Sequence, residues 1–557
     1  MDRIGKIKRS IKGIPVLYPL AKFLSSPREE LKQWKDFFAF KNGFQRIFSV
    51  KSKTESRGKL LIVSLHGNSV NAIKEEAFFA KAAQLHGLEP YILTSRGAWA
   101  NRYYKVFGID KFIYFEKFFR KLPLQKIRKD AREYAHTIQT FDQLMAFEYE
   151  GVKIGKYICS SLVRKTYTGE VDMGNPETRK YIQYYLEETM SNALAAKAIF
   201  EMYNPAAVLF LERGYTPYGE FFDIALERGL NVVQWCGSHT DNAFMLKRFH
   251  RGLEDQHPAS LSEKTWDMLK KMPWTEERSK KIKQELFQNY SSGGWFSEVG
   301  TQFNTSMMEK EKIQKMLGLD PKKKTAFIFP HLFWDATFFW GEDIFTNYRD
   351  WFIHAVKAAC ANPHLNWVIK IHPANVVKLN RDGYKGELVE KLTIREVIGE
   401  LPSHVKLLEP TTKISTFSLY SWIDYCLTVR GTPGIEAAMF GIPVLTAGTG
   451  RYDRHGFTID SSTREDYLEK LSKIHTYPRL TPEQIELAEK FAYGTFLVRP
   501  FPFKSIKISY ERDKKATPKV NYLLSSTEDL FKAKDLAAFG QWFVDSKDED
   551  YIELSQL

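Results

Sequence analysis

The chain has 557 residues, of which 43% are hydrophobic and 27% charged, and its net charge is +14. This length exceeds what one hydrophobic core usually supports, so two or more domains are expected. The composition is that of an ordinary globular protein, and the absence of any run near 20 apolar residues excludes a membrane-spanning class.

Basic residues are concentrated in two segments, 1–22 and 111–132, where they alternate with aromatic and aliphatic residues. Gly13, Pro15 and Pro19 interrupt the apolar part of the first segment, so no signal peptide and no secretion are predicted. The pattern suits an anionic membrane surface or a lipid-linked phosphate as well as it suits RNA. Alternatively, both segments are solvated helix faces that bind neither a membrane nor RNA.

The four cysteines lie far apart in the sequence, without a CxxC pair or a histidine spacing typical of zinc. They fit buried thiols in a reducing cytoplasm. No metal site is predicted.

A first α/β block begins at Lys59, where KLLIVSLHG reads as a strand. A helical stretch (75–87) and a second strand (89–95) follow, which is the order of a parallel βαβ unit. A helical region covers about 123–203, and residues 205–239 read as strand, loop, helix, strand and loop.

A second α/β block begins at Thr325, after a polar and partly helical stretch at 253–323. A helix is expected over 347–361, with strands at NWVIKIHP, HVKLLEP, IDYCLTV and VLT. A mixed segment follows residue 480. The sequence therefore predicts two doubly wound α/β domains.

Polar groups stand at the carboxyl ends of the predicted strands, where open α/β sheets bind ligands. A cleft between the two sheets would bring the four groups together. They are His66, Glu212, the Lys370–Pro373 corner and the Arg430–Thr432 turn.

The turn after IDYCLTV is a candidate phosphate site. Thr432 and the proline after it are a helix-start signal, and the N–H groups of such a turn favour an anion. Gly431 and Gly434 would leave the backbone open, Arg430 could add a contact, and Glu436 could bind ribose hydroxyls. Alternatively, Thr432 only caps the helix and Glu436 only complements its dipole.

The KIHP corner is a second candidate. Pro373 stops the strand and exposes His372, which can donate to a phosphate oxygen or, as a cation, stabilise a departing phosphate. Lys370 projects to the same strand face as His372. Alternatively, the corner is structural.

Three stretches resemble bacterial capsule polysaccharide biosynthesis proteins, the group that includes Kdo-transferring GT-B glycosyltransferases. They are KIHPAN, the run LTVRGTPGIEAAMFGIPVLTAGTGRYDRHGFTID, and FPHLFWDAT. In such families the His-Pro corner and the small-residue helix start hold the donor phosphates, which implies His372, Thr432 and Glu436. The resemblance covers about 325–460. Arg430-Gly431-Thr432 departs from the paired serines of better-known sugar transferases.

The resemblance implies two Rossmann-like domains facing a central cleft, an acceptor domain at 59–250 and a nucleotide-sugar domain at 325–480. A basic helical segment (1–58), a helical linker (251–324) and a C-terminal helical segment (481–557) would complete the chain.

An inverting transfer needs a base for the acceptor hydroxyl and stabilisation of the leaving phosphate. Glu212, Asp335 and His66 are candidates for the base. Each has a structural alternative: an ion pair for Glu212, a helix cap for Asp335 and a turn for His66. No metal is required if His372, Lys370 and the helix start stabilise the phosphate.

The leading hypothesis is a cytoplasmic glycosyltransferase, peripheral on the inner membrane face, that extends a surface polysaccharide. Its predicted partners are a nucleotide-sugar donor, a polysaccharide or lipid-linked acceptor and an anionic membrane. No nucleic acid and no cofactor are expected, because the nucleotide-sugar is a substrate. Three alternatives are a teichoic-acid-type polyol-phosphate transferase, a nucleotide-sugar 2-epimerase, and a non-catalytic scaffold or nucleic-acid-binding protein.

Overall fold

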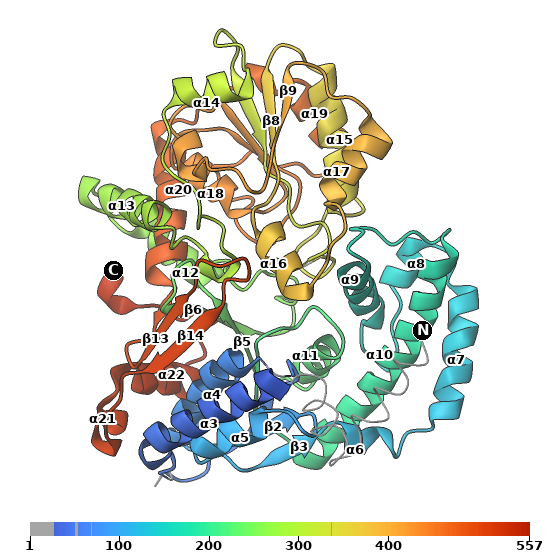
Figure 1. Cartoon of the computed structure of the whole chain (residues 1–557), viewed down its shortest axis with the longest axis vertical. Coiled ribbons are helices and arrows are strands. Elements are labelled where there is room, and N and C mark those ends of the chain that lie inside the picture. The colour runs from blue at the N-terminus through green and yellow to red at the C-terminus, as the bar shows by residue number, and fades with distance from the viewer. Residues whose placement is uncertain (1–26, 51–53, 68, 336) are drawn as a thin grey trace.

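Two separate sheets with parallel cores form the frame of the molecule. The computed structural model describes residues 27–50, 54–67, 69–335 and 337–557. Figure 1 shows the second sheet and its helices as an upper lobe above the lobe of the first sheet. The prediction of an α/β protein with two doubly wound sheets is confirmed. The membrane contact predicted for residues 1–22 lies outside the described residues.

The first sheet has seven strands in the order β12-β6-β5-β4-β1-β2-β3. Strands β1 to β5 pair in parallel, whereas β6 and β12 are antiparallel to their neighbours. The strands are β1 (Gly58–Val63), β2 (Leu88–Thr94), β3 (Phe112–Tyr114), β4 (Ala207–Phe210), β5 (Asn231–Gly237), β6 (Ala243–Phe249) and β12 (Phe501–Pro502).

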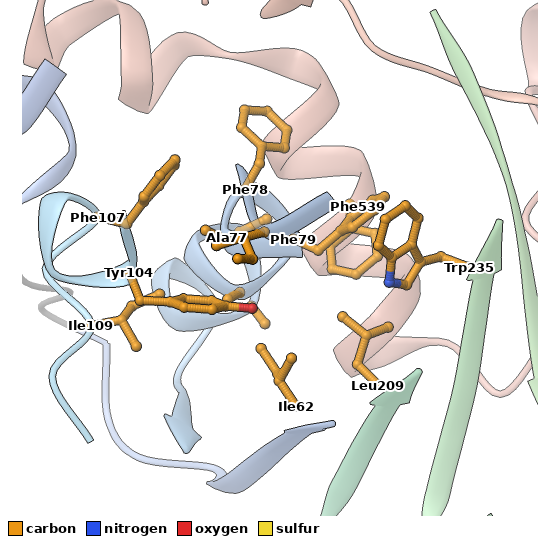
Figure 2. Packing of buried hydrophobic residues seen from close by; sticks show 14 of the residues in the cluster. Ile62, Ala77, Phe78, Phe79, Tyr104, Phe107, Ile109, Leu209, Trp235 and Phe539 are labelled. Carbon is orange, nitrogen blue, oxygen red and sulfur yellow. The ribbon is translucent and has the colours of Figure 1, made fainter. Parts of the chain in front are cut away.

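Helices of the first lobe cover this sheet on both faces. Figure 2 shows Phe79 of α4 against Trp235 of the sheet and Phe539 of α22, at ring-centroid distances of 5.4 and 4.7 Å. The helices are α3 (Pro27–Phe48), α4 (Val70–Leu85), α5 (Ala100–Val106), α6 (Glu116–Phe119), α7 (Leu124–Thr137), α8 (Phe141–Met145), α9 (Ile154–Thr166), α10 (Pro176–Tyr203) and α11 (Tyr218–Glu227).

The second sheet is parallel throughout, in the order β11-β10-β7-β8-β9. Its central strands are buried along their whole length, as expected for a sheet covered on both faces. The elements are β7 (Thr325–Ile328), α15 (Tyr348–Ala361), β8 (Asn366–Lys370), α16 (Ala374–Asp382), α17 (Val389–Thr393), η2 (Ile394–Ile398), β9 (Val405–Leu408), η3 (Thr416–Leu419), β10 (Tyr425–Thr428), α18 (Thr432–Ala438), β11 (Val444–Thr446), α19 (Arg464–Ser472) and η4 (Ile474–Thr476).

Helices without a sheet strand connect the lobes over residues 251–324, in agreement with the polar composition of that stretch. They are α12 (Glu263–Lys271), α13 (Glu276–Ser292), η1 (Ser297–Val299) and α14 (Lys310–Leu317). The domain limits drawn from the sequence stay predictions.

The segment after residue 480 contains strands as well as the predicted helices. Its strand β12 joins the edge of the first sheet, and β13 pairs with β14 in an antiparallel hairpin beside α4. The elements are α20 (Pro482–Tyr493), η5 (Gly494–Val498), β12, β13 (Ile506–Tyr510), β14 (Pro518–Tyr522), α21 (Thr527–Lys532), α22 (Lys534–Asp545) and η6 (Leu554–Gln556). The chain thus ends by completing the lobe in which it began.

The basic segment 111–132 is part of the first lobe rather than a separate amphipathic helix. It forms β3, α6 and the start of α7, and Ile113, Phe115, Ile127 and Ala131 lie in the hydrophobic core. Its basic side chains remain exposed. The four core residues are therefore unavailable for insertion into a membrane, whereas other apolar side chains of the segment are partly exposed beside the charges: Phe112, Phe118, Phe119, Leu122 and Leu124.

Candidate functional site

The predicted polar groups flank the point in each sheet where the strand order reverses. In the first sheet β2 and β4 lie on opposite sides of β1, and in the second sheet β8 and β10 lie on opposite sides of β7. Such switch points open a crevice at the carboxyl ends of the strands. His66 follows β1 and Glu212 follows β4, whereas His372 follows β8 and Arg430 follows β10.

His372 stands at the carboxyl end of β8, half-buried beside the switch point of the second sheet. Its Nδ1 accepts a hydrogen bond of 3.2 Å from the Ala374 amide, which leaves the ring proton on Nε2. Burial and the nearby Lys370 ammonium lower the pKa of His372 to about 3. His372 is therefore a neutral hydrogen-bond donor in this structure, not the cation that the sequence analysis considers.

Lys370, the last residue of β8, is a buried cation. Burial lowers its pKa to about 8, and the Glu436 carboxylate acts in the opposite direction. Among the described residues its ammonium has no hydrogen-bond or ion-pair partner. A buried ammonium without a partner favours an anionic ligand.

Arg430 is held within the protein instead of pointing into the site. Its guanidinium pairs with Asp343 and donates to Tyr348 Oη at 3.0 Å and to the Thr449 carbonyl at 3.1 Å. Its amide donates to His331 Nε2 at 3.1 Å, and the Gly431 amide donates to Thr428 Oγ1 at 3.2 Å. The turn is therefore less open than the sequence predicts, because two of its N–H groups already have partners.

The helix start also differs from its prediction. Gly431 is the cap of α18 and Thr432 is the first helical residue, one position earlier than expected. The Gly434 backbone is covered, because a Cβ there would lie 2.1 Å from the Tyr452 hydroxyl, which donates to the Gly431 carbonyl at 2.7 Å. The open glycine surface expected for a phosphate is thus occupied by Tyr452.

Glu436 is fully buried. Its Oε2 accepts hydrogen bonds from Tyr290 and from Tyr420 at 2.5 and 2.9 Å, and its Oε1 is buried with no hydrogen-bond partner within the described ranges. Burial raises its pKa, against the effect of the two phenols. Contact of Glu436 with a ribose stays a prediction, and its placement favours a role inside the lobe.

The covered glycine leads to a stability prediction. Gly434→Val is expected to lower the free energy of unfolding by about 1–3 kcal/mol, because the new side chain must displace the buried Tyr452 ring. Urea titration of both proteins measures the loss. Tyr452→Phe removes the atom nearest to the added Cβ, so the valine should cost less in that background. Equal stability of Gly434→Val and the parent would contradict this packing.

Arg451 is a site residue that the sequence analysis missed. It follows β11 in the loop that carries Tyr452, and one of its Nη atoms donates to the Arg430 carbonyl at 3.2 Å. Its Nε is buried and has no hydrogen-bond partner in the described part of the chain. Burial lowers its pKa, and the Arg430 charge adds to that effect. A lone arginine in a loop carries no sequence signal, so only the fold identifies it.

His331 is a second missed residue. Its ring stacks on Tyr348 with centroids 4.6 Å apart, and burial together with Arg430, His372 and Arg451 lowers its pKa well below the usual range. The carboxyl end of the second sheet thus combines two neutral imidazoles, His331 and His372, with three basic side chains, of which Arg430 is already paired with Asp343. The arrangement is chemically suited to a di- or triphosphate.

Glu212 has the properties of a base among the three candidates. Its Oε1 accepts hydrogen bonds from the amides of Arg213 and Gly214 at 2.7 and 2.9 Å. Burial raises its pKa above the usual range despite these bonds. A carboxylate with a raised pKa holds a transferred proton better than an ordinary one.

Asp335 instead bridges the lobes. Its carboxylate pairs with Lys378, lies 3.7 Å from Arg164 Nε and accepts from Tyr215 Oη at 2.8 Å. Burial opposes its ionisation, but Lys378 and Arg164 outweigh this and lower its pKa. The structure therefore brings Asp335 to the junction, but as an ion-pair partner.

His66 pairs with a buried carboxylate that the sequence analysis missed. His66 Nε2 lies 3.3 Å from Glu76 Oε2, which also accepts from Tyr104 Oη at 2.8 Å. His66 Nδ1 is buried and finds no hydrogen-bond partner among the residues that the structure describes. Burial is the main cause that raises the pKa of Tyr218, and the Glu76 and Glu212 carboxylates add to it.

The junction between the lobes is packed around Glu212. Phe339 of the second lobe lies on the Gly214 backbone, and Trp340 contacts the His257 ring at a centroid distance of 4.2 Å. Two cavities, of about 290 and 430 Å³, lie elsewhere and are lined by none of the predicted site residues. At this point the predicted central cleft is filled by contacts between the lobes.

Two negative findings apply to residues 27–557 outside the gaps given above. No three histidine, cysteine or carboxylate side chains there are grouped so that they could hold a metal ion. In the same part of the chain, each helix is too short or too polar to cross a bilayer.

Comparison with known proteins gives distant structural similarity only. No protein-family model and no curated protein matches the sequence. The solved structures that resemble the chain include the β-Kdo 2,4-transferase of Thermosulfurimonas dismutans KpsC, with 16% identity over 57% of this chain and 84% of that one and a TM-score of 0.33. The β-Kdo 2,7-transferase of the same KpsC has 12% identity over 61% and 89%, with a TM-score of 0.32. A UDP-GlcNAc 2-epimerase from Neisseria meningitidis, bound to UDP-GlcNAc, has 13% identity over 78% and 95%, with a TM-score of 0.29. The description of the fold accordingly rests on the strand order and direction of the two sheets.

Proposed function

We propose that this protein is an inverting, metal-independent glycosyltransferase that uses a nucleotide-activated sugar. One observation carries the proposal. The buried Lys370 ammonium, the Arg451 guanidinium and the neutral donor His372 lie at or after strand ends near the switch point of one sheet. Glu212, a carboxylate of raised pKa, follows a strand at the switch point of the other sheet.

Arg213, the residue after Glu212, donates to the Gln256 carbonyl at 2.7 Å, and the His257 amide donates to the carbonyl of Gly450, the residue before Arg451, at 2.9 Å. These contacts support a site in which the candidate base and Arg451 would face each other across the junction.

The donor phosphates would lie against His372, Lys370 and Arg451. His372 offers its Nε2 proton and Lys370 a buried ammonium. Arg451 offers a buried guanidinium nitrogen that has no hydrogen-bond partner among the described residues. Thr432, Gly431 and Gly434 would shape the adjoining turn. Arg430 would support the site through the Arg451 and His331 contacts and not by touching the ligand.

In the reaction Glu212 would take the proton of the acceptor hydroxyl. The hydroxyl oxygen then bonds to the anomeric carbon while the bond from that carbon to the phosphate oxygen breaks. The electron pair leaves with the phosphate, where the cations stabilise the new charge. A surface polysaccharide or its lipid-linked precursor as acceptor rests on the sequence resemblance over residues 325–460.

The protein would also contact an anionic membrane surface, through its charges and without inserting core residues. The outward charges of 111–132 would act mainly through long-range attraction, since Ile113, Phe115, Ile127 and Ala131 pack in the core.

A thermal-shift screen with CMP, UDP, GDP and CDP tests the donor site, because a ligand that binds the folded state raises its apparent stability. Incubation of the preferred nucleotide-sugar with and without acceptor then separates the reactions. A 2-epimerase would interconvert the sugar without acceptor, and a polyol-phosphate transferase would release CMP and leave a phosphodiester. Failure of all four nucleotides to shift the melting temperature would refute the proposal.

Removal of the His372 ring tests the phosphate contact. His372→Ala is expected to lower the transfer rate by roughly 10² to 10³, because one neutral donor to the leaving phosphate is lost. His372→Gln keeps a donor and should retain more activity than alanine. Circular dichroism checks that both variants fold. Turnover of His372→Ala near that of the parent would remove the residue from the site.

The pKa of Lys370 predicts how nucleotide affinity depends on pH. The ammonium is charged below about pH 8, so affinity should be full there. Above that value the free protein loses this charge, and the dissociation constant should rise by about tenfold per pH unit. Calorimetric titration between pH 6.5 and 9.5 gives the profile. Lys370→Arg stays charged throughout and should flatten it; a flat profile in the parent would exclude Lys370 from the phosphate contact.

A further inference from the structure

Helix α3 exposes two large apolar side chains. Leu31 is 58% and Phe38 50% exposed, whereas Phe37 and Phe40 of the same helix lie in the core of the first lobe. Leu31 and Phe38 are seven positions apart, or about two helical turns, so they lie on one stripe of the helix. Figure 1 shows α3 on the surface of the lower lobe, beside α5. The stripe therefore faces solvent.

The exposed Phe38 ring rests on other aromatic rings. It stacks on Trp34 with centroids 5.6 Å apart, and Trp34 contacts the buried Trp99 at a centroid distance of 5.0 Å. The Arg102 guanidinium lies 4.7 Å from the centroids of both indole rings. Packing thus holds Phe38 at the surface, and a side chain already held in place loses little entropy when a partner covers it.

Cations surround the two exposed apolar residues. Lys35 lies one helical turn from each of them, at i+4 from Leu31 and i−3 from Phe38. On α3, the exposed charged side chains that the structure describes are Arg28, Lys32, Lys35 and Arg46, against Asp36. In the sequence, the basic segment 1–22 ends shortly before α3 begins at Pro27. The face is thus apolar in its centre and positive around it.

Helix α5 connects this face with the second basic segment, 111–132. Arg102, which contacts Trp34, and Lys105 lie about one turn apart on α5. Lys105 Nζ is 6.0 Å from the centroid of the Phe112 ring in β3, within that segment. The two basic regions that the sequence shows separately are therefore joined on one side of the first lobe.

The pattern favours one of three occupants. A second copy of this chain, paired about a twofold axis, would bring the same cations close to one another, which opposes pairing. A nucleic acid would use the cations and the aromatic ring but would leave Leu31 without a contact. An anionic lipid surface suits all of them, because apolar side chains enter the headgroup boundary while lysine and arginine stay at the level of the phosphates.

We propose that the α3 face, formed by Leu31, Lys32, Lys35 and Phe38, docks the protein on an anionic membrane surface. Leu31 and Phe38 enter the headgroup boundary, and the two lysines pair with lipid phosphates. The exposed charges of 111–132 add long-range attraction on the same side of the lobe. This assignment rests on the membrane contact included in the proposed function, and on no step of the sugar transfer.

Co-sedimentation of the full chain with vesicles of phosphatidylcholine and phosphatidylglycerol tests the face. The parent should bind, more tightly at low salt than at high salt. Leu31→Gln and Phe38→Gln should each lower the partition coefficient by roughly tenfold at both salt concentrations, because apolar insertion is not screened. The double variant Lys32→Gln/Lys35→Gln should lower it by roughly 30-fold at low salt and have little effect at high salt.

The matched control is Phe287→Gln, because Phe287 is also 50% exposed but lies on α13, outside the first sheet and its helices. It should bind vesicles as the parent does. Leu31→Gln and Phe38→Gln should shift the melting temperature no more than this control, since solvent already reaches both side chains. A larger shift would mean that another part of the chain covers the face, and would overturn the assignment.

Four further results would also overturn it. They are binding of no vesicle by the parent, parent-like binding by both apolar variants, a loss confined to the lysine variant, and a dimer of the parent that the apolar variants dissociate in sedimentation velocity. The parent reports on membrane contact as such, and the variants report on the α3 face. Nucleotide-induced thermal shifts in the same samples report separately on the proposed transfer, because these variants leave the second lobe unchanged.

Discussion

Glu212→Gln is expected to lower the rate of sugar transfer by roughly 10² to 10⁴ while nucleotide affinity stays unchanged. The amide keeps the size of the side chain and can still accept from the Arg213 and Gly214 amides. It cannot take the proton of the acceptor hydroxyl. Steady-state turnover with the preferred nucleotide-sugar, combined with calorimetric titration of the nucleotide, separates this loss of chemistry from a loss of binding.

His66→Asn and Asp335→Asn are the comparisons for that experiment. Asp335→Asn should reduce activity through the junction between the lobes, because it removes the charge that Lys378 and Arg164 share. That effect should appear in thermal stability as well as in rate. Full turnover by Glu212→Gln together with loss of turnover in His66→Asn would move the base to the His66–Glu76 pair.

Asp550→Ala is expected to destabilise the protein by about 3–5 kcal/mol, the usual effect of leaving buried charges without their counter-ion. The Asp550 carboxylate is buried and lies 3.2 Å from Lys247 Nζ and 3.2 Å from Arg499 Nη2, and it accepts from the Ser262 amide at 2.7 Å. Urea denaturation followed by tryptophan fluorescence measures the loss. Asp548→Ala removes a solvent-exposed pair with Lys264 and should cost less than about 1 kcal/mol.

Asp550 also predicts how the stability of the protein changes at acidic pH. Burial opposes its ionisation, but Arg499 and Lys247 lower its pKa to about 2. An unfolded aspartate titrates near pH 4, so Asp550 contributes its full stabilisation above about pH 4 and loses it as pH falls toward 2. Asp550→Ala should therefore show a flatter decline in stability over that range. An equally steep decline in the variant would place the acid-sensitive group elsewhere.

The hydrophobic strands were predictable from sequence, and the buried charges were not. Apolar runs such as NWVIK indicate β8 because a doubly covered strand shows its burial directly in its composition. Strand β6 carries Lys247 and Arg248, two residue types that usually lie on the surface. Both are buried here, because Lys247 donates to Asp550 and Arg248 donates to the Trp542 carbonyl, far along the chain. Pairing between distant segments leaves no local pattern.

The candidate site shows the same division. Lys370 and His372 were predicted at the end of a strand, and the structure has them there. Arg430 and Gly434 were predicted to be open to a ligand. That prediction missed Asp343 beside Arg430 and Tyr452 beside Gly434, because a local motif does not show contacts with distant residues. Arg451 and Glu76 gain their importance from burial, which depends on the whole fold.

The return of the chain to its first lobe has a consequence for synthesis. Strand β12, helix α22 and Asp550 complete the lobe that begins with β1, so that lobe cannot reach its final form until residues near 550 have left the ribosome. The second sheet is continuous between residues 325 and 446 and can assemble earlier. During translation the nascent first lobe therefore exposes the apolar surface of α4 that α22 later covers, and this is the interval in which a chaperone would bind it.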